Sequence, residues 1–291
     1  MASLLITGGT RGLGLAAAKS SAARGAHVLV AGRSPQAVER VAHEVGGEPV
    51  GLGLENLADV ARCADELPHV DAVALNAGLQ IVTGATRTTD DFEATFQINH
   101  LAHLLLIDRL LARPTPPRRV VFTGSGTHDP ARRSGMPAPL DGNVASWARA
   151  GDGEEPPATA GRRRYTTSKL LNTATAAALA RERPDVHVTC FDPGLMLGTG
   201  LSRQYPLMAR RLTTWLAPIL ALAPFASTPQ RSGAALSRLL LDEPSPAESG
   251  AYVDYRLHTL PASAQARDQT FQDTSLHDSR QLLTPWASHQ S

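Results

Sequence analysis

A chain of 291 residues with 42% hydrophobic and 19% charged side chains can bury one large α/β core and has the composition of a globular protein. Its 28 basic and 27 acidic side chains nearly balance, which argues against a nucleic-acid-binding surface. Cys63, Cys190 and ten scattered histidines match no metal-ligand or disulfide spacing, so no metal site is expected. The first strand-like run begins almost at once and leaves no room for a leader segment, so we expect a soluble cytoplasmic protein.

Strand-like apolar runs alternate with helix-like segments along the whole chain. The predicted strands are 4–7, 27–31, 49–52, 71–75, 119–123, 186–191 and 251–254. The predicted helices are 12–24, 35–45, 57–67, 90–111, 164–183 and 229–241. This alternation predicts an α/β single-domain Rossmann fold, with a doubly wound, mainly parallel seven-stranded sheet and helices on both faces. Ligands bind such sheets beyond the carboxyl ends of the strands.

The domain is expected to cover residues 1–258, followed by a C-terminal tail over 259–291. Residues 129–164 are rich in proline, glycine and arginine, and we expect them to form an insertion loop near the active site. Residues 200–226 are more apolar, but their prolines and limited length exclude a transmembrane helix. This segment is interpreted as a substrate lid, with an ordinary packed helix or loose membrane contact as alternatives.

A glycine-rich turn joins the first predicted strand to the first predicted helix. Gly8, Gly12 and Gly14 allow a sharp bend, a close approach of the backbone to a pyrophosphate, and close packing of the helix on the strand. The start of the helix presents free N–H groups and the positive end of its dipole to a phosphate. The residues of this turn predicted to contact a dinucleotide are Gly8, Thr10, Arg11, Gly12, Leu13 and Gly14.

Tyr165 and Lys169 are four positions apart on a predicted helix and therefore share one face. A free tyrosine titrates near pH 10, and a neighbouring ammonium group lowers the pKa of its hydroxyl toward the neutral range. An isolated pair of this kind is usually a surface tyrosine with a solvated lysine. The catalytic interpretation therefore depends on the motifs elsewhere in the chain.

Over residues 4–254 the chain resembles the short-chain dehydrogenase/reductase family, because six motifs occur in that family's order. They are the glycine turn Thr7–Gly14, Asn76-Ala77-Gly78, the helix residue Asn99, Ser125 after the fifth strand, Tyr165 with Lys169, and Pro193-Gly194. The resemblance implies that the asparagine-alanine-glycine motif steadies the sheet beside the cofactor and that the proline-glycine turn braces the nicotinamide. It also implies that Asn99 holds a proton-relay water.

The resemblance further implies a role for each catalytic side chain. Hydride transfer to a carbonyl creates a developing alkoxide, which needs a hydrogen-bond donor and a proton. Ser125 would orient the oxygen, Tyr165 would deliver the proton, and Lys169 would lower the pKa of the tyrosine while holding the nicotinamide ribose. Asn99 would connect the site to solvent through water. In the opposite direction the same residues oxidise an alcohol.

The charge pattern after the second strand favours NADP(H). An NAD site places a carboxylate there, and that carboxylate would repel a 2′-phosphate. In this chain Arg33 and Ser34 follow the strand instead, and Arg33 together with Arg11 can clamp a phosphate, the alternative being two surface arginines. Gly53 stands where the family commonly has an aspartate that contacts the adenine. Because Gly53 has no side chain, we expect the adenine to be held through backbone groups or more loosely.

Ser125 and Tyr165 are 40 positions apart (165 − 125), more than in compact family members, so the segment between them is an insertion. Together with the motifs Ser168-Lys169-Leu170-Leu171-Asn172 and Pro193-Gly194-x-x-x-Gly198-Thr199-Gly200-Leu201, this spacing resembles the retinol dehydrogenase and protochlorophyllide reductase branch. Leu171 replaces a cysteine of the light-driven enzymes. Thr199 is expected to contact the nicotinamide carboxamide or a cofactor phosphate. His128 is either a polar contact in the pocket or an ordinary loop residue.

These observations predict an NADPH-dependent carbonyl reductase for a bulky, largely apolar small molecule. The alternatives are alcohol oxidation, protochlorophyllide reductase-like reduction of a C=C bond, and a non-catalytic NADP-sensing protein. Family dimers commonly pair the helices that carry Asn99 and Tyr165 with their mates. The insertion precedes the second of these helices, so we expect a monomer rather than a homodimer. Membrane contact is ranked last among the possible interactions.

Overall fold

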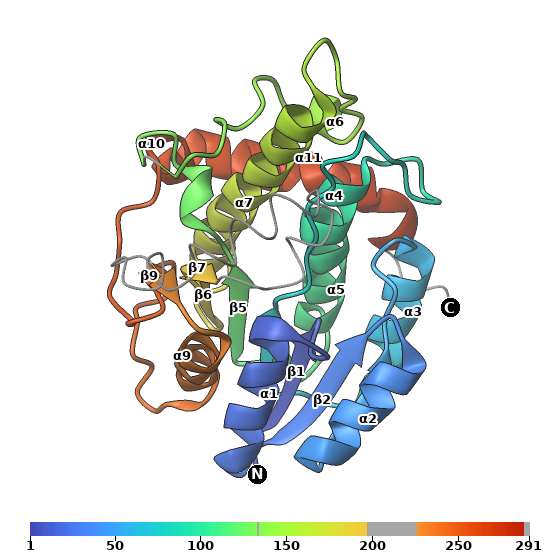
Figure 1. The fold of residues 1–291 in the computed structure, drawn as a ribbon. Helices are drawn as coiled ribbons and strands as arrows, with labels where there is room; N and C mark the ends of the chain where they lie inside the picture. The colour runs from blue at the N-terminus through green and yellow to red at the C-terminus, as the bar shows by residue number, and fades with distance from the viewer. Residues whose placement is uncertain (133, 197–225, 288–291) are drawn as a thin grey trace, which may run out of the picture.

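The computed structural model describes residues 1–132, 134–196 and 226–287. Within these ranges one seven-stranded sheet has the order β3-β2-β1-β4-β5-β6-β9, with every neighbouring pair parallel, and helices cover both faces (Figure 1). The strands are β1 (Ser3–Thr7), β2 (His27–Gly32), β3 (Glu48–Gly51), β4 (Ala72–Leu75), β5 (Arg119–Thr123), β6 (His187–Asp192) and β9 (Tyr252–Asp254), and β7 (Leu195–Met196) pairs separately with β8 (Ala226–Ser227). The predicted doubly wound Rossmann sheet is confirmed.

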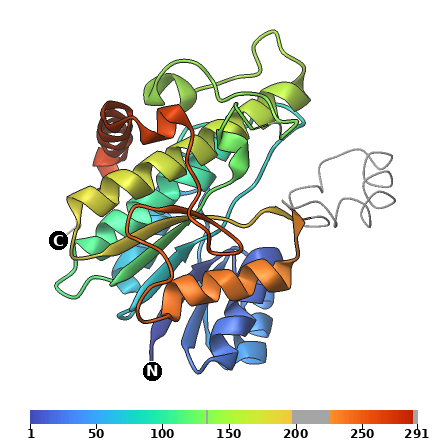
Figure 2. The same cartoon turned by 90° about the vertical axis from the view of Figure 1, so that its left-hand side faces the viewer.

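The main helices divide into two layers. One face carries α1 (Gly12–Ala23), α2 (Pro35–Val45) and α9 (Pro229–Leu241), and the other carries α3 (Leu57–Glu66), α5 (Ala102–Leu111) and α7 (Pro157–Glu182). Figure 2 shows α9 beside α1. The two helices approach closely at Gly233, where an added Cβ would lie 2.6 Å from the main chain of Ala16. The small residues of α1 therefore allow tight packing at this point.

Strand β1 shows why the apolar runs become central strands. Leu4, Leu5 and Ile6 are fully buried. Successive side chains point to opposite faces, so Leu4 and Ile6 pack in the core under α1, whereas Leu5 packs in the core under α5. A strand that is covered on both faces needs a continuous apolar run rather than an alternating one.

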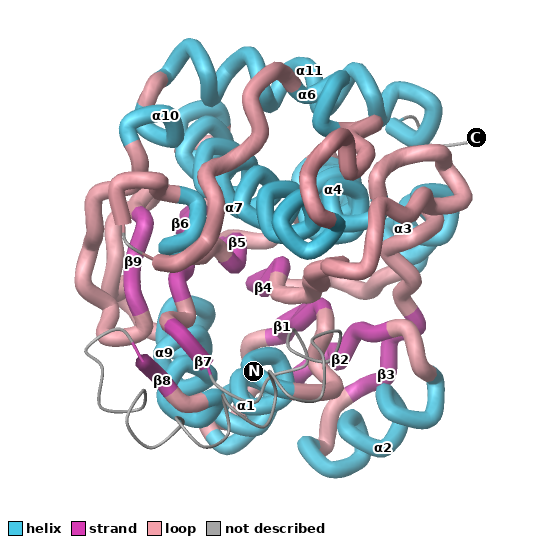
Figure 3. The backbone as a smooth tube through the Cα atoms, turned by 45° about the horizontal axis from the view of Figure 1, so that its top comes forward, coloured by secondary structure: helices cyan, strands magenta, loops and turns pink. Residues whose placement is uncertain are grey.

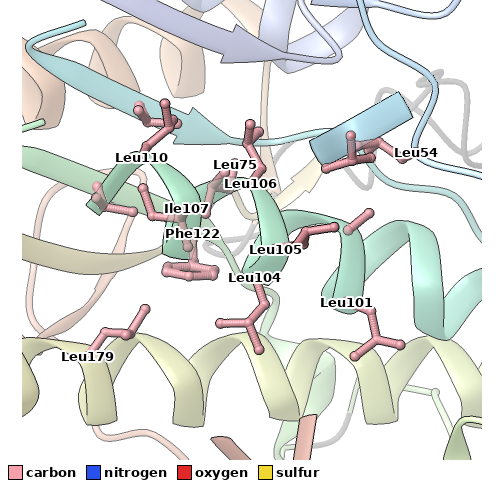
Figure 4. Close-up of a cluster of buried hydrophobic side chains, with 14 of the residues drawn as sticks. Leu54, Leu75, Leu101, Leu104, Leu105, Leu106, Ile107, Leu110, Phe122 and Leu179 are labelled. Carbon is pink, nitrogen blue, oxygen red and sulfur yellow. The ribbon is translucent and has the colours of Figure 1, made fainter. Parts of the chain in front are cut away.

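Helix α5 has apolar side chains on several sides because it is almost entirely buried. In Figure 4, Leu106 points toward Leu75 of β4, and Leu104 points toward α7. Ile107 lies near Phe122 of β5 in the same view. All of these side chains are almost completely buried. The helix therefore fills the layer between the sheet and the outer helices.

Two predicted helices differ by more than one residue from the sequence expectation in their boundaries. The helix predicted over 90–111 begins only at α4 (Ala94–Phe96), because Asp91 has a positive φ of 62° that ends any helix there. A π-helical turn, η1 (Gln97–Leu101), then joins α4 to α5. Helix α7 begins at Pro157, seven residues before the expected start at 164. Its proline occupies the first turn, where the missing N–H costs nothing.

The expected C-terminal tail instead folds into α10 (Ala264–Arg267) and α11 (Gln269–Ala287), and α11 packs along α7 and α5 (Figure 1). Leu276 and Leu283 are buried in the same core as α5. Arg280 binds the carboxylates of Asp108 and Glu182 at 2.8 Å each. Residues 259–287 are therefore part of the domain. The polar composition of this helix conceals its narrow apolar face from the sequence pattern.

Candidate active site

The glycine turn after β1 has the geometry that its glycines were predicted to allow. Gly8 and Gly12 have positive φ values of 66° and 53°. At Gly14, an added Cβ would lie 2.3 Å from the Gly8 carbonyl oxygen and 2.6 Å from Asn76 Nδ2. Arg11 occupies the N-cap of α1 without a side-chain cap, and the first turn of α1 contains no acidic residue. This helix start therefore fits a phosphate group, as a bound dinucleotide requires.

The remaining residues of the turn contribute in different ways. Leu13 is 6% exposed and packs in the core, so only its main chain is available to a cofactor. Thr10 lies against the end of β2, since its Cγ2 would be 3.3 Å from a Cβ added at Gly32. Arg33 and Ser34 follow β2 on an exposed surface, and Ser34 is the N-cap of α2. The structure therefore places Arg33 beside the carboxyl edge of the sheet, as expected.

Glu55 is a residue that the sequence reasoning missed. A Cβ added at Gly53 would lie 3.6 Å from the Glu55 carboxylate. A carboxylate is thus present beside the position where the family commonly has an aspartate. Its position two residues after Gly53 is the feature of the sequence that could have identified it. Glu55 is a candidate for the adenine contact.

Asn76, Ala77 and Gly78 connect the ends of β1 and β4. The Thr7 hydroxyl oxygen accepts hydrogen bonds from the main-chain N–H groups of Asn76 at 2.8 Å and Ala77 at 3.0 Å. Asn76 Nδ2 donates to the Thr7 carbonyl at 2.8 Å. A Cβ added at Gly78 would lie 3.2 Å from Asn99 Oδ1 and 3.9 Å from Lys169 Nζ. The motif therefore joins the glycine turn to the catalytic residues.

Tyr165 and Lys169 lie together on α7, with the Lys169 ammonium 5.6 Å from the centre of the Tyr165 ring. Lys169 Nζ donates a hydrogen bond of 2.8 Å to the Thr123 carbonyl at the end of β5. Burial lowers the pKa of Lys169 from 10.5 to about 8. A lysine this deeply buried is not a solvated surface residue, so the structure favours the catalytic interpretation of the pair.

Ser125 lies two residues beyond the end of β5 and is the N-cap of the 3₁₀ turn η2 (Gly126–His128). Its Oγ accepts hydrogen bonds from Thr127 Oγ1 at 3.0 Å and from the Thr127 N–H at 3.3 Å. The ring of His128 lies 2.7 Å from the Ser125 carbonyl through Nδ1, and its Nε2 accepts from the Ser263 N–H at 3.1 Å. Both ring nitrogens of His128 are engaged and the residue is fully buried. The structure therefore favours a structural loop role for His128 over a pocket contact.

Asn99 lies on the π-helical turn η1, a feature that local patterning did not indicate. Its Oδ1 accepts from the Leu79 N–H at 2.8 Å, and its Nδ2 donates to the Leu79 carbonyl at 2.9 Å and to Ser168 Oγ at 3.0 Å. These bonds fix the loop after β4 against α7. Asn99 Oδ1 and Lys169 Nζ both lie close to Gly78, at 3.2 Å and 3.9 Å from a Cβ added there. The relay water that the resemblance implies for Asn99 stays a prediction.

The turn Pro193-Gly194 follows β6 and is held by Asp192, which the sequence reasoning did not select. Asp192 Oδ1 accepts from the Gly194 N–H at 3.0 Å, and Gly194 has a positive φ of 72°. The Tyr252 hydroxyl donates to Asp192 Oδ2 at 2.6 Å. Thr199 and residues 200–225 of the expected lid lie outside the described residues.

The insertion between Ser125 and Tyr165 is tied to the catalytic helix by Arg164. The buried guanidinium of Arg164 lies 3.3 Å from Glu93 and 2.8 Å from Asp152, which belongs to the insertion. Residues 144–147 of the insertion form the short helix α6 (Val144–Trp147). Trp147 is 3% exposed, so the insertion has a packed part of its own.

These candidate residues gather around the carboxyl ends of β1, β2, β4, β5 and β6, which lie side by side in the interior of Figure 3. This is the edge at which open α/β sheets bind ligands. No helix among residues 1–132, 134–196 and 226–287 is long and apolar enough to cross a membrane.

Comparisons with known proteins agree with this geometry. The family described as "short chain dehydrogenase" matches residues 2–129. "Putative daunorubicin C-13 ketoreductase DnrU" of Streptomyces sp. (strain C5) is 36% identical over 201 residues, which are 66% of this chain and 64% of that protein. "Short chain dehydrogenase atnD" of Emericella nidulans is 32% identical over 245 residues, which are 75% of this chain and 74% of that protein.

The chain spans about half to two thirds of the length of the first curated relatives it matches, with coverages of 64%, 55% and 50%. Among solved structures, an uncharacterised protein from Mycobacterium paratuberculosis matches with a TM-score of 0.69 at 23% identity. That match covers 98% of this chain and 94% of the other. At this level of identity the likeness concerns the fold.

Proposed function

Because the chain belongs to the short-chain dehydrogenase/reductase family, we propose that it is an NAD(P)-dependent oxidoreductase and, within that class, an NADPH-dependent reductase of ketones on bulky, largely apolar small molecules. The observation that carries this proposal is the buried Lys169 beside Tyr165 on α7, with Ser125 at the end of the adjoining strand β5.

The proposed reaction follows from what these side chains can donate. When bound, the nicotinamide supplies the hydride that reduces the carbonyl carbon. The Ser125 hydroxyl donates a hydrogen bond to the carbonyl oxygen, and the Tyr165 hydroxyl transfers its proton to that oxygen as negative charge develops. The Lys169 ammonium has three N–H donors, and one of them is used by the Thr123 carbonyl. The other two N–H donors remain for the cofactor ribose. The positive charge of the Lys169 ammonium favours the tyrosinate that forms when Tyr165 gives up its proton.

The preference for NADPH over NADH rests on charge. Arg33 follows β2, and the residues from His27 to Ser34 include no carboxylate. Arg11 occupies the N-cap position of α1 in the glycine turn. An exposed guanidinium at each position suits the additional phosphate of NADPH, since arginine binds phosphate through paired N–H donors.

The proposed substrate class rests on two observations. A relative that is 36% identical carries the name of a ketoreductase for daunorubicin C-13. Leu195, immediately after the Pro193-Gly194 turn, is 42% exposed, and apart from Met1 it is the only large exposed hydrophobic residue within the described ranges. An apolar side chain at the edge of the site favours an apolar substrate over a sugar or a small acid.

We also propose that the protein is a monomer. Helix α11 packs along α7 and α5, which carry Tyr165 and the turn of Asn99. These are the two helices through which family dimers commonly pair. Because Leu276 and Leu283 bury their side chains on this face, a second protomer would have to displace α11.

The test is NADPH consumption by the purified chain with a panel of polycyclic aromatic ketones, simple ketones, aldehydes and quinones. Tyr165→Phe should lower kcat by about 10³-fold, within the range expected for loss of a general acid, and leave the Kd for NADPH within about twofold. Tyr255→Phe, which removes a tyrosine hydroxyl outside the site, is the matched control. Undiminished turnover in Tyr165→Phe would overturn the assigned mechanism. Faster turnover with NADH than with NADPH would overturn the cofactor assignment.

A further inference from the structure

A buried row of polar side chains connects the catalytic lysine to the C-terminal helix. It consists of Lys169 and Asn172 on α7, His100 on η1, and Ser279 on α11. Each of these residues is at most 4% exposed. Burying a polar group this deeply raises the free energy of the folded state unless the group is hydrogen-bonded. We therefore expect each of these side chains to have a hydrogen-bond partner.

Asn172 lies at the centre of the row. Its Nδ2 donates to the Asn99 main-chain carbonyl at 3.0 Å and to the Thr123 carbonyl at 3.4 Å. The Thr123 carbonyl is the same oxygen that accepts the Lys169 ammonium at 2.8 Å. Asn172 Oδ1 lies 3.3 Å from His100 Nδ1. One amide therefore contacts the carbonyl that holds the lysine, the main chain of Asn99, and a buried histidine.

The pairing fixes the direction of each hydrogen bond. Burial lowers the pKa of His100 to about 4, so its ring is neutral and has one donor and one acceptor. Because Asn172 presents its oxygen, His100 Nδ1 carries the hydrogen and donates. His100 Nε2 then accepts, and the Ser279 hydroxyl at 2.9 Å is its donor. The row therefore runs from Ser279 through His100 and Asn172 to the Asn99 carbonyl.

A second histidine, His103, also contacts the Asn99 carbonyl oxygen. His103 Nδ1 lies 3.3 Å from this oxygen, and His103 Nε2 lies 3.1 Å from the Thr7 hydroxyl. Burial lowers the pKa of His103 to about 3, so its ring is also neutral. With its hydrogen on Nδ1 it donates to the Asn99 carbonyl, and its Nε2 then accepts from the Thr7 hydroxyl, which also lies 3.2 Å from the Ala74 carbonyl. The Asn99 carbonyl thus accepts from both His103 and Asn172.

We propose that Asn172 is a positioning residue for the reaction, because it holds the Asn99 carbonyl and the carbonyl that receives the Lys169 ammonium. His100 and Ser279 anchor Asn172 to α11, so the C-terminal helix contributes to the geometry of the catalytic lysine. The inference rests on the proposed function only for its effect on turnover. The hydrogen-bond pattern itself can be tested without a substrate.

Removal of the Asn172 side chain has a predictable effect on Lys169. The truncated site keeps three polar partners for a water molecule: the carbonyls of Asn99 and Thr123, and His100 Nδ1. Water beside the ammonium group relieves its desolvation and raises its pKa.

The other titratable groups that face Lys169 stay in place. They are Tyr165 on α7, whose ring centre lies 5.6 Å from Lys169 Nζ, Cys190 and Asp192 on β6, and His103 on α5. Any shift in the titration of Lys169 therefore reports the loss of Asn172.

The first experiment reads the histidine tautomers by long-range ¹⁵N–¹H NMR on the wild-type chain, with signals assigned through His100→Gln and His103→Gln. Both rings are expected to be neutral at pH 7 and to carry hydrogen on Nδ1. An Nε2–H tautomer at His100 would overturn the inferred row, whatever the activity of the enzyme.

The second experiment compares kcat, KM and the pH–rate profile of three variants with wild type. Asn172→Ala should lower kcat about tenfold or more, with little change in KM, and should move the alkaline limb of the profile upward. Ser279→Ala should lower kcat by about fivefold, the factor that one net hydrogen bond is worth. Ser275→Ala is the matched control on α11, because its hydroxyl bonds only within its own helix, to the Gln272 carbonyl at 3.2 Å.

Equal kinetics for Ser279→Ala and Ser275→Ala would overturn the role of α11. An Asn172→Ala enzyme with wild-type kcat and an unmoved alkaline limb would overturn the positioning role. If Asn172→Ala does not fold, Ser279→Ala and the NMR measurement decide the question. Absence of turnover in the wild-type chain with every carbonyl compound would refute the proposed function, and the tautomer measurement would still test the row.

Discussion

Replacing Gly14 by alanine tests the nucleotide turn without knowledge of the substrate. The added Cβ would lie 2.3 Å from the Gly8 carbonyl oxygen and 2.6 Å from Asn76 Nδ2. The first of these atoms belongs to the main chain of the turn, and the second is held by the Thr7 carbonyl at 2.8 Å. Neither atom can move away easily, so α1 must shift away from the turn. The free N–H groups at the start of α1 would then no longer lie where they can bind a phosphate of the cofactor.

The size of the effect can be estimated from the overpacking. Inserting one methyl group into a closely packed site costs about 1–3 kcal/mol. At about 2–4 °C of Tm per kcal/mol for a domain of this size class, Gly14→Ala should lower Tm by roughly 2–12 °C. The Kd for NADPH should rise at least about tenfold, which corresponds to about 1.4 kcal/mol of lost binding.

The assay combines thermal unfolding with a fluorescence titration of NADPH. Gly51→Ala is the matched control, because a Cβ at Gly51 would meet no atom within 4 Å. This control should bind NADPH like the wild type. If Gly14→Ala binds NADPH as tightly as Gly51→Ala does, the close packing at Gly14 does not form the cofactor site, and the reasoning fails.

Three further predictions concern charge and assembly. Burial lowers the pKa of Lys169 to about 8, so kcat/KM should fall above about pH 8. The contribution of Lys169 to the free energy of unfolding should instead rise from pH 8 toward its ordinary pKa of 10.5, because the unfolded chain binds more protons than the folded chain in that range. Activity and urea-unfolding profiles that fall together would contradict this. Arg33→Ala should weaken NADPH binding about tenfold and leave NADH binding unchanged. The control is Arg40→Ala, which removes an exposed arginine of α2. Equal losses of affinity for both cofactors in Arg33→Ala would contradict a 2′-phosphate contact. Sedimentation should show a single species with the mass of one chain, and a stable dimer would refute the proposed monomer.

The features that the sequence alone determined are local in the chain. The glycine turn depends on residues that are within seven positions of one another, and the spacing of Tyr165 and Lys169 puts them on one face of any helix. The parallel direction of the strands follows from the alternation of apolar runs and helical segments, because parallel strands need crossover connections, whereas their order in the sheet comes from the tertiary structure. The backbone chemistry of a few neighbouring residues is sufficient for each of these inferences.

The tertiary structure decided what depends on contacts between distant residues. His100 and Ser279 are separated by 179 positions, and their hydrogen bond exists only because α11 packs on α5 and α7. The π-helical turn at Asn99, and the burial that lowers the pKa of Lys169, likewise arise from packing. The sequence around a polar side chain does not indicate which distant residue it will hydrogen-bond. The low-dielectric interior in which a buried polar group needs a partner forms only when the chain has folded.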